Sequence, residues 1–462
     1  MRRNAFSRAM VLASAALSAA CSDPSTPTVP TTQLASEPSV SLRGSSCRPP
    51  TPDNQIPLPI APPSKRIDLF TPVFSRSTSV TNPLFPISNL SQAILVGAAD
   101  GEPLRIETTL MPKTLRVRVG NGSVETLASQ FVAYVGRRIH EYALDRYAQA
   151  DDGSVWYFGE DVFNYEDGEI ADTEGTWLAC KDGPAAMIMA ANPRVGDVFR
   201  TENAFPIVFE EVTVQIVGQT VQGPRGPVTG AVTMQEMHMD GSLEKKVFAP
   251  GYGEFGSGAF PDFEAMALAV PTDALPGGTP SDLRALTSGA RRLFQLAAKH
   301  DWGAASQLAS GMNAAWGRQK TNHVPPLLEP LMTAALTDVT QSVSQQRIAE
   351  THQAAVDVLR VGLDLELQFR SRVEIDGERL DLWLRQLVID AKAHDSAGIA
   401  SDLAILKWIL DRLDNVGSNE AQRDAHDVAQ QLSGIGAAVK RGDFKRVVER
   451  ARRLLDEPDE DD

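Results

Sequence analysis

The sequence is poor in the residues and motifs on which many enzyme sites depend. Its 462 residues include only 7 histidines and 3 cysteines. The G-x-S-x-G motif that carries a nucleophilic serine is absent, and so is the zinc-binding H-E-x-x-H motif. The hydrolase classes that use these motifs are therefore not predicted.

Positive charge is also in deficit. Lys and Arg number 44 against 59 Asp and Glu, so the formal net charge is −15. Nucleic acids and anionic lipid surfaces attract clustered Lys and Arg, so this balance argues against both as partners. Hydrophobic residues make up 42% of the chain and charged residues 22%, which is ordinary for a soluble globular protein.

The first residues differ from the rest. Three arginines lie among the first eight residues, and an apolar run of small residues follows at 9–20. This run is shorter than the roughly 20 residues that a membrane-spanning helix needs. A basic start, a short apolar core and a small-residue end predict a secretory signal peptide at 1–20.

The end of this segment, Leu17-Ser18-Ala19-Ala20-Cys21, resembles the bacterial lipobox, in which small residues precede a lipidated cysteine. Leu17 stands four residues before Cys21, whereas the usual leucine stands three before. The alternative is ordinary signal-peptide cleavage beside an incidental cysteine. Residues 22–46 are rich in Ser, Thr and Pro, which suits a flexible tether. We therefore expect lipidation of Cys21, a disordered tether at 21–64, and a location in the bacterial cell envelope, facing the periplasm or the exterior.

After residue 64 the spacing of apolar residues changes once, from a strand pattern to a helix pattern. At this length two or three domains are expected. Up to about residue 270 short runs of alternating apolar and polar residues are separated by turn residues, as in Leu115–Val119 followed by Gly120-Asn121-Gly122. This pattern predicts an antiparallel β domain at 65–270, either a sandwich or a curved half-barrel.

A Pro- and Gly-rich linker at 271–281 precedes an all-α region of helical hairpins or bundles at 282–455. Apolar residues there recur at spacings of three and four, and Asp301, Asp395 and Asp443 each begin a new helix. An acidic tail follows at 456–462. The candidate helices are 282–300, 303–317, 326–344, 348–369, 377–393, 397–414, 419–440 and 444–455.

Two motif matches are interpreted as structural. Gly251–Gly256 fits G-x-G-x-x-G, but no helix pattern opens at its last glycine, so it is interpreted as a strand end and not as a nucleotide site. Ser242–Lys245 fits S-x-x-K but follows the hairpin signal Asp240-Gly241.

Cys47 and Cys180 could pair in an oxidising compartment. Because Cys47 lies in a linker and Cys180 lies within a domain, two free thiols are the favoured interpretation.

Histidines offer little support for a metal or haem site. The β domain holds His140 and His238, and the helical region holds five more that are scattered along it: His300, His323, His352, His394 and His426. A helical metal site needs His and carboxylates three or four residues apart on facing helices, and His426 has no such neighbours. The sequence predicts no metal and no cofactor.

The densest group of aromatic and acidic residues lies at 155–174, VWYFGEDVFNYEDGEIADTE. The EF-hand spacing of calcium ligands is absent from it. Glu160 follows Phe158 closely and is the best candidate for a carboxyl with a raised pKa. The favoured interpretation is a hairpin that turns at Glu166-Asp167-Gly168, with Trp177 packing near Trp156, and the alternative is the rim of a ligand site.

This stretch resembles a group of uncharacterised bacterial secreted proteins and lipoproteins. The shared motifs are Tyr147–Gln149, Asp152–Asp161, Tyr165–Gly168, Gly175–Ala179, Asp182–Pro184, Met187–Met189, Asn192–Pro193, Val195–Arg200 and Ala249–Gly253. In the group's pattern a glycine stands where this chain has Cys180, which implies that no shared disulfide or active-site residue lies there. The resemblance covers roughly residues 104–255 and implies no activity, and Gly251 marks the end of its β domain.

Three hypotheses follow. The first is a non-enzymatic binding or scaffold protein of the envelope, attached to the membrane through its N-terminal lipid and contacting an unidentified protein or ligand. The second is an envelope hydrolase that uses carboxylates near Glu160 and Asp161, which requires two inward-facing carboxylates in one pocket. The third and weakest is a metal or haem protein, which requires at least two histidines of the helical region to converge. No residue is assigned a catalytic role.

Overall fold

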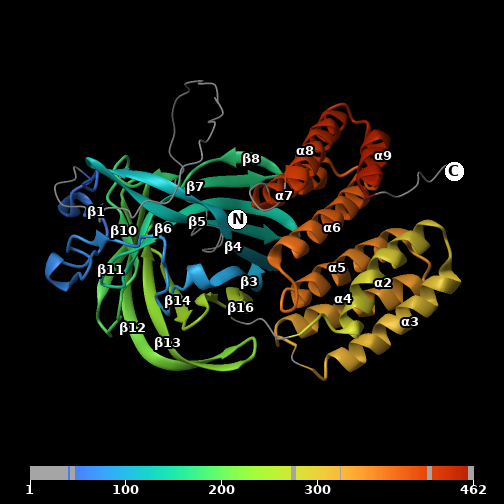
Figure 1. Ribbon diagram of the computed structural model, residues 1–462, viewed down its shortest axis with the longest axis horizontal. Coiled ribbons are helices and arrows are strands. Elements are labelled where there is room, and N and C mark those ends of the chain that lie inside the picture. The colour runs from blue at the N-terminus through green and yellow to red at the C-terminus, as the bar shows by residue number, and fades with distance from the viewer. Residues whose placement is uncertain (1–39, 42–46, 272–276, 323, 414–418, 456–462) are drawn as a thin grey trace.

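The computed structural model describes residues 40–41, 47–271, 277–322, 324–413 and 419–455. A β domain is followed by an α domain, as the sequence predicted (Figure 1). Cys21 and the acidic tail lie outside the described residues. None of the described helices is long and apolar enough to cross a membrane.

Within the described residues, one antiparallel sheet of 14 strands forms the β domain. The strand order is β10-β7-β6-β5-β4-β3-β16-β15-β14-β13-β12-β11, and β8 and β9 both pair with β7. The sandwich alternative is therefore wrong, because the strands belong to one sheet. The strands are β3 (Leu90–Ala99), β4 (Glu102–Val119), β5 (Gly122–Val135), β6 (Arg138–Gln149), β7 (Val155–Glu166), β8 (Glu169–Asp172), β9 (Trp177–Leu178), β10 (Ala186–Met189), β11 (Val198–Ala204), β12 (Val208–Gly223), β13 (Gly226–His238), β14 (Leu243–Ala249), β15 (Gly253–Ala259) and β16 (Asp262–Pro271).

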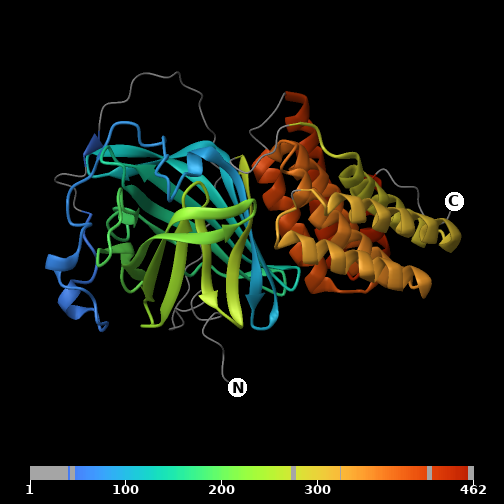
Figure 2. The ribbon, with the colours of Figure 1, turned by 90° about the horizontal axis from the view of Figure 1, so that it is seen from below.

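The sheet curves strongly about its own inner face (Figures 1 and 2). Its two terminal strands, β10 and β11, lie next to each other without forming a hydrogen-bonded ladder. Register shifts interrupt several pairings, for example between Arg200 and Glu202 of β11, and such bulges bend a strand and increase its twist. The result is a nearly closed barrel with a hollow interior.

The segment that precedes the barrel packs against several of its strands, including β11. It contains β1 (Val40–Ser41), β2 (Val73–Phe74) and the 3-10 turns η1 (Asp53–Gln55), η2 (Pro63–Lys65) and η3 (Ile87–Asn89). Arg200 donates to Asp53 (2.8 Å), and the backbone of Ala61 donates to Glu211 (2.7 Å). The prediction that ordered structure begins near Lys65 is therefore wrong, because residues 47–64 pack against the barrel.

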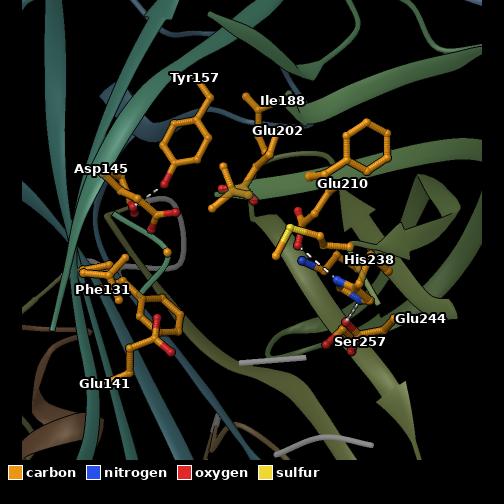
Figure 3. A pocket seen from close by; sticks show the side chains of 18 of the residues that line it. Phe131, Glu141, Asp145, Tyr157, Ile188, Glu202, Glu210, His238, Glu244 and Ser257 are labelled. Atoms are coloured by element: carbon orange, nitrogen blue, oxygen red, sulfur yellow. Dashed lines mark hydrogen bonds and ion pairs between the residues drawn. The ribbon is translucent and has the colours of Figure 1, made fainter. Parts of the chain in front are cut away.

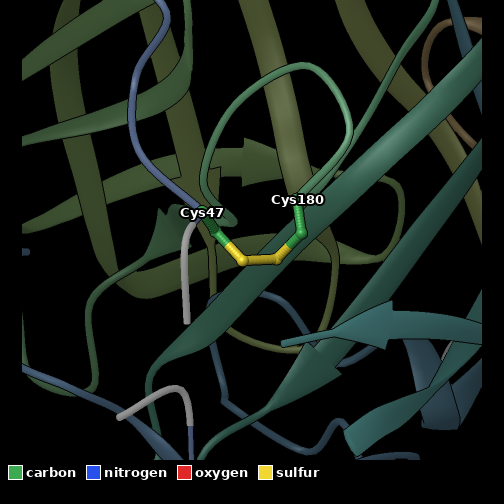
Figure 4. The surroundings of a disulfide bond; sticks show 2 residues. All are labelled: Cys47 and Cys180. Carbon is green, nitrogen blue, oxygen red and sulfur yellow. A yellow bond between two sulfur atoms is a disulfide. The ribbon is translucent and has the colours of Figure 1, made fainter. Parts of the chain in front are cut away.

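Cys47 and Cys180 form a disulfide bond (Figure 4). The favoured interpretation of two free thiols is wrong. The bond joins the N-terminal segment to the loop after β9, across 133 residues of sequence. Closing so long a loop restricts the unfolded chain, and such bonds stabilise proteins by about 2–4 kcal/mol.

Eight helices of the described residues follow the β domain and match the eight predicted ones. Asp301 and Asp443 accept the backbone N–H groups of Ala304 and Arg446, and therefore cap their helices as expected. The helices are α2 (Ser281–Ala298), α3 (Trp302–Gln319), α4 (Leu328–Ser344), α5 (Ile348–Glu366), α6 (Arg372–Lys392), α7 (Ser396–Leu413), α8 (Asn419–Val439) and α9 (Phe444–Leu454).

A cluster of buried charges joins the two domains. Arg412 of α7 is fully buried, donates to Glu107 of β4 (2.9 Å) and lies 3.4 Å from Asp376 of α6. Although burial raises the pKa of Glu107, the arginines around it hold that pKa well below its usual range. The cluster contains three cations and three anions, which we call the interdomain charge cluster: Arg105, Glu107, Asp364, Asp376, Arg379 and Arg412.

The predicted hairpin at 155–174 exists, and it contacts the helical domain. Its turn holds Gly168 at φ +79°, where a Cβ atom would lie 2.3 Å from the backbone nitrogen of Ser401 on α7. Trp408 of α7 donates to the hydroxyl of Tyr165 (2.9 Å) and stacks on Tyr142 of β6. This part of the stretch therefore serves packing between the domains.

Candidate functional site

The interior of the barrel contains a cavity of about 300 Å³ (Figure 3). Residues of β5, β6, β7 and β10 to β16 contribute to its lining. Along β6 the lining residues are Glu141, Ala143, Asp145 and Tyr147, which alternate as the inward face of one strand must. The inner face of the sheet therefore surrounds the site on most sides.

Carboxyl groups dominate the charged lining. Two basic residues, His238 and Lys246, face ten acidic residues: Glu141, Asp145, Glu160, Glu174, Glu202, Glu210, Asp240, Glu244, Glu254 and Glu264. Aromatic and aliphatic side chains such as Phe131, Tyr157 and Ile188 fill the space between them. The cavity thus combines negative charge with apolar surface.

One side of the cavity consists of acids without basic partners. We call Glu141, Asp145, Glu160 and Glu202, which come from β6, β7 and β11, the acid wall. Among the described residues none of the four forms an ion pair with Lys, Arg or His. Asp145 accepts a hydrogen bond from Tyr157 (2.8 Å), and Glu202 accepts one from Trp177 (3.1 Å). The carboxyls of Glu160 and Glu202 lie close enough for each to affect the pKa of the other.

The lack of counter-charge changes the protonation of these acids. Burial, with the charge of Asp145 nearby, raises the pKa of Glu141 to about 8. Burial also raises the pKa of Asp145 to about 6 and that of Glu202 to about 8. The pKa of Glu160 is raised well above its ordinary value by burial and by the charge of Glu202. At neutral pH the acid wall therefore holds protons that a cation could replace.

The opposite side carries its own cations. We call Glu210, Glu236, His238, Glu244 and Lys246 the mixed wall. His238 lies between Glu210 (Nδ1, 3.1 Å) and Glu244 (Nε2, 3.3 Å), and Lys246 lies 2.8 Å from Glu236. Burial lowers the pKa of His238, but the hydrogen bonds to the two glutamates outweigh it and raise that pKa to about 10. The positive charges of His238 and Lys246 therefore balance most of the negative charge of the mixed wall.

The mixed wall also contains the one metal-compatible group found among the described residues. The ligand atoms of Glu210, Glu236 and His238 lie within 4.8 Å of one another. A metal ligand must be a neutral imidazole, whereas His238 holds a proton between two carboxylates. The group therefore fits an internal ion-pair network better than a metal site.

The histidines of the helical domain do not support the third hypothesis where they are described. His352 is buried and hydrogen-bonds the backbone carbonyl of Phe294 (2.9 Å). His300 and His394 follow the ends of α2 and α6 with positive φ. None of these three belongs to a metal-compatible group. His323 and the side chain of His426 lie outside what the structure describes.

The two acids singled out from the sequence point in different directions. Glu160 lines the cavity, whereas Asp161 pairs with Arg146 and its side chain is 46% exposed. The next acids along the chain, Glu166 and Asp167, lie in the exposed hairpin turn. Trp177 packs edge-on against Tyr157, and it belongs to the same buried core cluster as Trp156. Of the predicted stretch, the structure therefore places Glu160, Tyr157 and Val162, together with Glu174 and Gly175, at the cavity.

Most of the cavity's acids were not anticipated. The sequence does contain a pattern that could have indicated them, because charged residues stand at alternate positions of predicted strands. Glu141 and Asp145 are one example, and Glu244 and Lys246 are another.

Comparison of the chain with protein-family models and with curated proteins gives no match. The resemblance to uncharacterised secreted proteins therefore stays a prediction, and the functional argument depends on the site itself.

Proposed function

We propose that this chain is a non-enzymatic binding protein of the bacterial cell envelope and that the barrel cavity binds a small organic cation. The observation that carries the proposal is the acid wall, in which four carboxyls face a cavity without basic partners. Charged side chains inside proteins are stable only when they are paired, protonated or bound to a cation. Protons on the acids meet this requirement, and an ammonium group is their natural replacement.

The apolar lining favours an organic cation over a hydrated metal ion. Tyr147 and Tyr157 stack with centroids 4.8 Å apart, and Tyr157 meets Trp177 edge-on. Aromatic faces attract ammonium groups by about 0.5–2 kcal/mol, and more strongly as water is excluded. A cation with a carbon skeleton would use both kinds of surface.

Calorimetric titration with n-butylammonium chloride tests this proposal. We expect binding to the wild type and binding at least about tenfold weaker to Glu202→Gln, because one charge-assisted hydrogen bond contributes about 1.5–3 kcal/mol. Asp161→Asn is the control, since Asp161 follows the cavity residue Glu160 on β7 but does not line the cavity. The proposal fails if no ammonium ion binds, or if the two variants weaken binding equally.

A hydrolase remains the second candidate, and one observation favours it. Glu160 and Glu202 lie together inside one cavity and both have raised pKa values, and a carboxyl with a raised pKa is what a general acid requires. Incubation with envelope glycan fragments distinguishes the two functions. Cleavage products that disappear in Glu160→Gln would favour the hydrolase, whereas fragments recovered intact would favour binding alone.

The location is proposed on two grounds. The N-terminal sequence predicts lipidation of Cys21, and the Cys47–Cys180 disulfide suits an oxidising compartment outside the cytoplasm. We expect mass spectrometry of the mature protein to find a lipid-modified N-terminal cysteine, and Cys21→Ala to move the protein from the membrane to the soluble fraction. An unmodified N-terminus at another residue would contradict the anchor.

A further inference from the structure

A second, smaller cavity adjoins the acidic one. Its volume is about 110 Å³, and it lies between η3, the strands β3, β4 and β5, and the start of β15. Five residues line both cavities: Phe131, Asp145, Tyr147, Glu254 and Glu264. The two spaces therefore meet at Asp145 and its neighbours, at one end of the acid wall.

The lining of the smaller cavity is mainly hydrocarbon. Away from the shared residues it is formed chiefly by Ile87, Leu90, Ala93, Leu95, Ile106 and Leu110. We call this space the apolar annex. Phe85 closes one side by meeting Tyr147 edge-on, with centroids 5.0 Å apart. The annex has no charge of its own except where it opens to the acidic cavity.

Filling an apolar space of this kind is favourable, because its lining gains contact partners. Apolar cavities of about 150 Å³ stay dry and bind benzene, so one of 110 Å³ accommodates a somewhat smaller hydrocarbon group. A metal ion or a short polyamine would leave the annex empty. A neutral hydrocarbon would leave the acid wall without a partner.

We propose that the ligand is an amphiphilic ammonium ion, whose charged group lies against the acid wall and whose hydrocarbon group of about four carbons fills the apolar annex. This inference rests on the proposed function. It adds that a single molecule occupies both cavities, with its charged end near Asp145, the residue of the acid wall that lines both.

The test is a chain-length series from methylammonium to n-hexylammonium, titrated into the wild-type protein by calorimetry. Burying one methylene group strengthens binding about fourfold, so we expect affinity to rise by about that factor per carbon up to butylammonium and then to level off. If the ions bind with affinities independent of chain length, the inference is overturned while the proposed function stands. If none of the ions binds, both are overturned.

A variant whose larger side chain fills the apolar annex distinguishes the contributions of the two cavities to binding. Ala93 lies on β3 with its side chain buried in the annex lining, so Ala93→Leu is expected to remove the chain-length dependence and to leave methylammonium binding within about twofold. Thr108→Leu on β4 provides a second filled variant if the first folds poorly. Chain-length dependence that persists in a folded, filled variant would show that the hydrocarbon group lies elsewhere.

Discussion

Replacement of Arg412 by alanine is expected to lower the free energy of unfolding by about 3–5 kcal/mol. Arg412 is fully buried within the interdomain charge cluster, where Glu107 and Asp376 lie within 3.4 Å of it. Removing the guanidinium leaves these acids short of one positive charge in a site that water does not reach. Chemical denaturation followed by intrinsic fluorescence measures the loss.

The control is Arg446→Ala. Arg446 pairs with Glu449 one turn along α9, its side chain is 45% exposed, and such pairs contribute about 0.3–0.5 kcal/mol. A double-mutant cycle of Arg412→Ala with Glu107→Ala should give a coupling energy well above about 0.5 kcal/mol, because the two groups are in direct contact. Equal losses in Arg412→Ala and Arg446→Ala would refute the assigned role of the cluster.

Thermal stability is expected to fall as pH rises from about 5 to about 9, by at least roughly 3 kcal/mol in the free energy of unfolding. The acids with raised pKa values bind protons in the folded state that the unfolded chain has already lost. Burial raises the pKa to about 8 for Glu141, Glu202 and Glu264, and to about 7 for Glu236. In this window the folded state holds more protons than the unfolded state, so each increase in pH favours unfolding.

His238 acts in the same direction at higher pH. Its contribution is fully present below pH about 6.5, the ordinary pKa, and is lost as pH rises through about 10, its value in the folded protein. Below pH 5 the sign reverses, since the pKa of Glu210 is lowered to about 2: burial raises it, but the His238 hydrogen bond outweighs that. Maximum stability is therefore expected near pH 5.

Melting temperature measured across this pH range, at constant ionic strength, checks the expectation. Glu141→Gln should make the decline shallower, because glutamine carries no charge to bury at any pH. Glu166→Gln, at the exposed end of β7, should leave the slope unchanged. A melting temperature that is constant or rises between pH 5 and pH 9 would contradict the assigned protonation of the cavity.

The helices were the part of the fold most accessible from sequence. Their apolar spacing and their Asp caps depend on residues a few positions apart, so α2 was predicted at 282–300 and found at Ser281–Ala298. The strands were also recognisable, because alternation is local. Which strands pair was not, since β3 pairs with β16, at the other end of the β domain in sequence, and nothing local specifies that contact.

The cavity was hidden for a different reason. In most sheets the polar half of an alternating strand faces water, but here helices cover part of the outer face and the polar half faces inward. Tyr142 of β6 packs under the helical domain, whereas its neighbours Glu141 and Ala143 line the cavity. The alternating pattern alone does not indicate which face of the sheet is enclosed.

The Cys47–Cys180 bond was not predicted from the sequence either, because it depends on the N-terminal segment running along β11.

The strand order has a consequence for how the chain reaches this structure. The barrel consists of two halves, one from β3 to β10 and one from β11 to β16, and among the described strands β3 and β16 form the one ladder that joins them. Until residue 271 is available, β3 presents an unpaired edge to its surroundings. Contacts between such distant segments form slowly, and unpaired edges expose a chain to aggregation. A newly made chain is therefore most vulnerable after its first half-barrel has formed and before its last strand arrives.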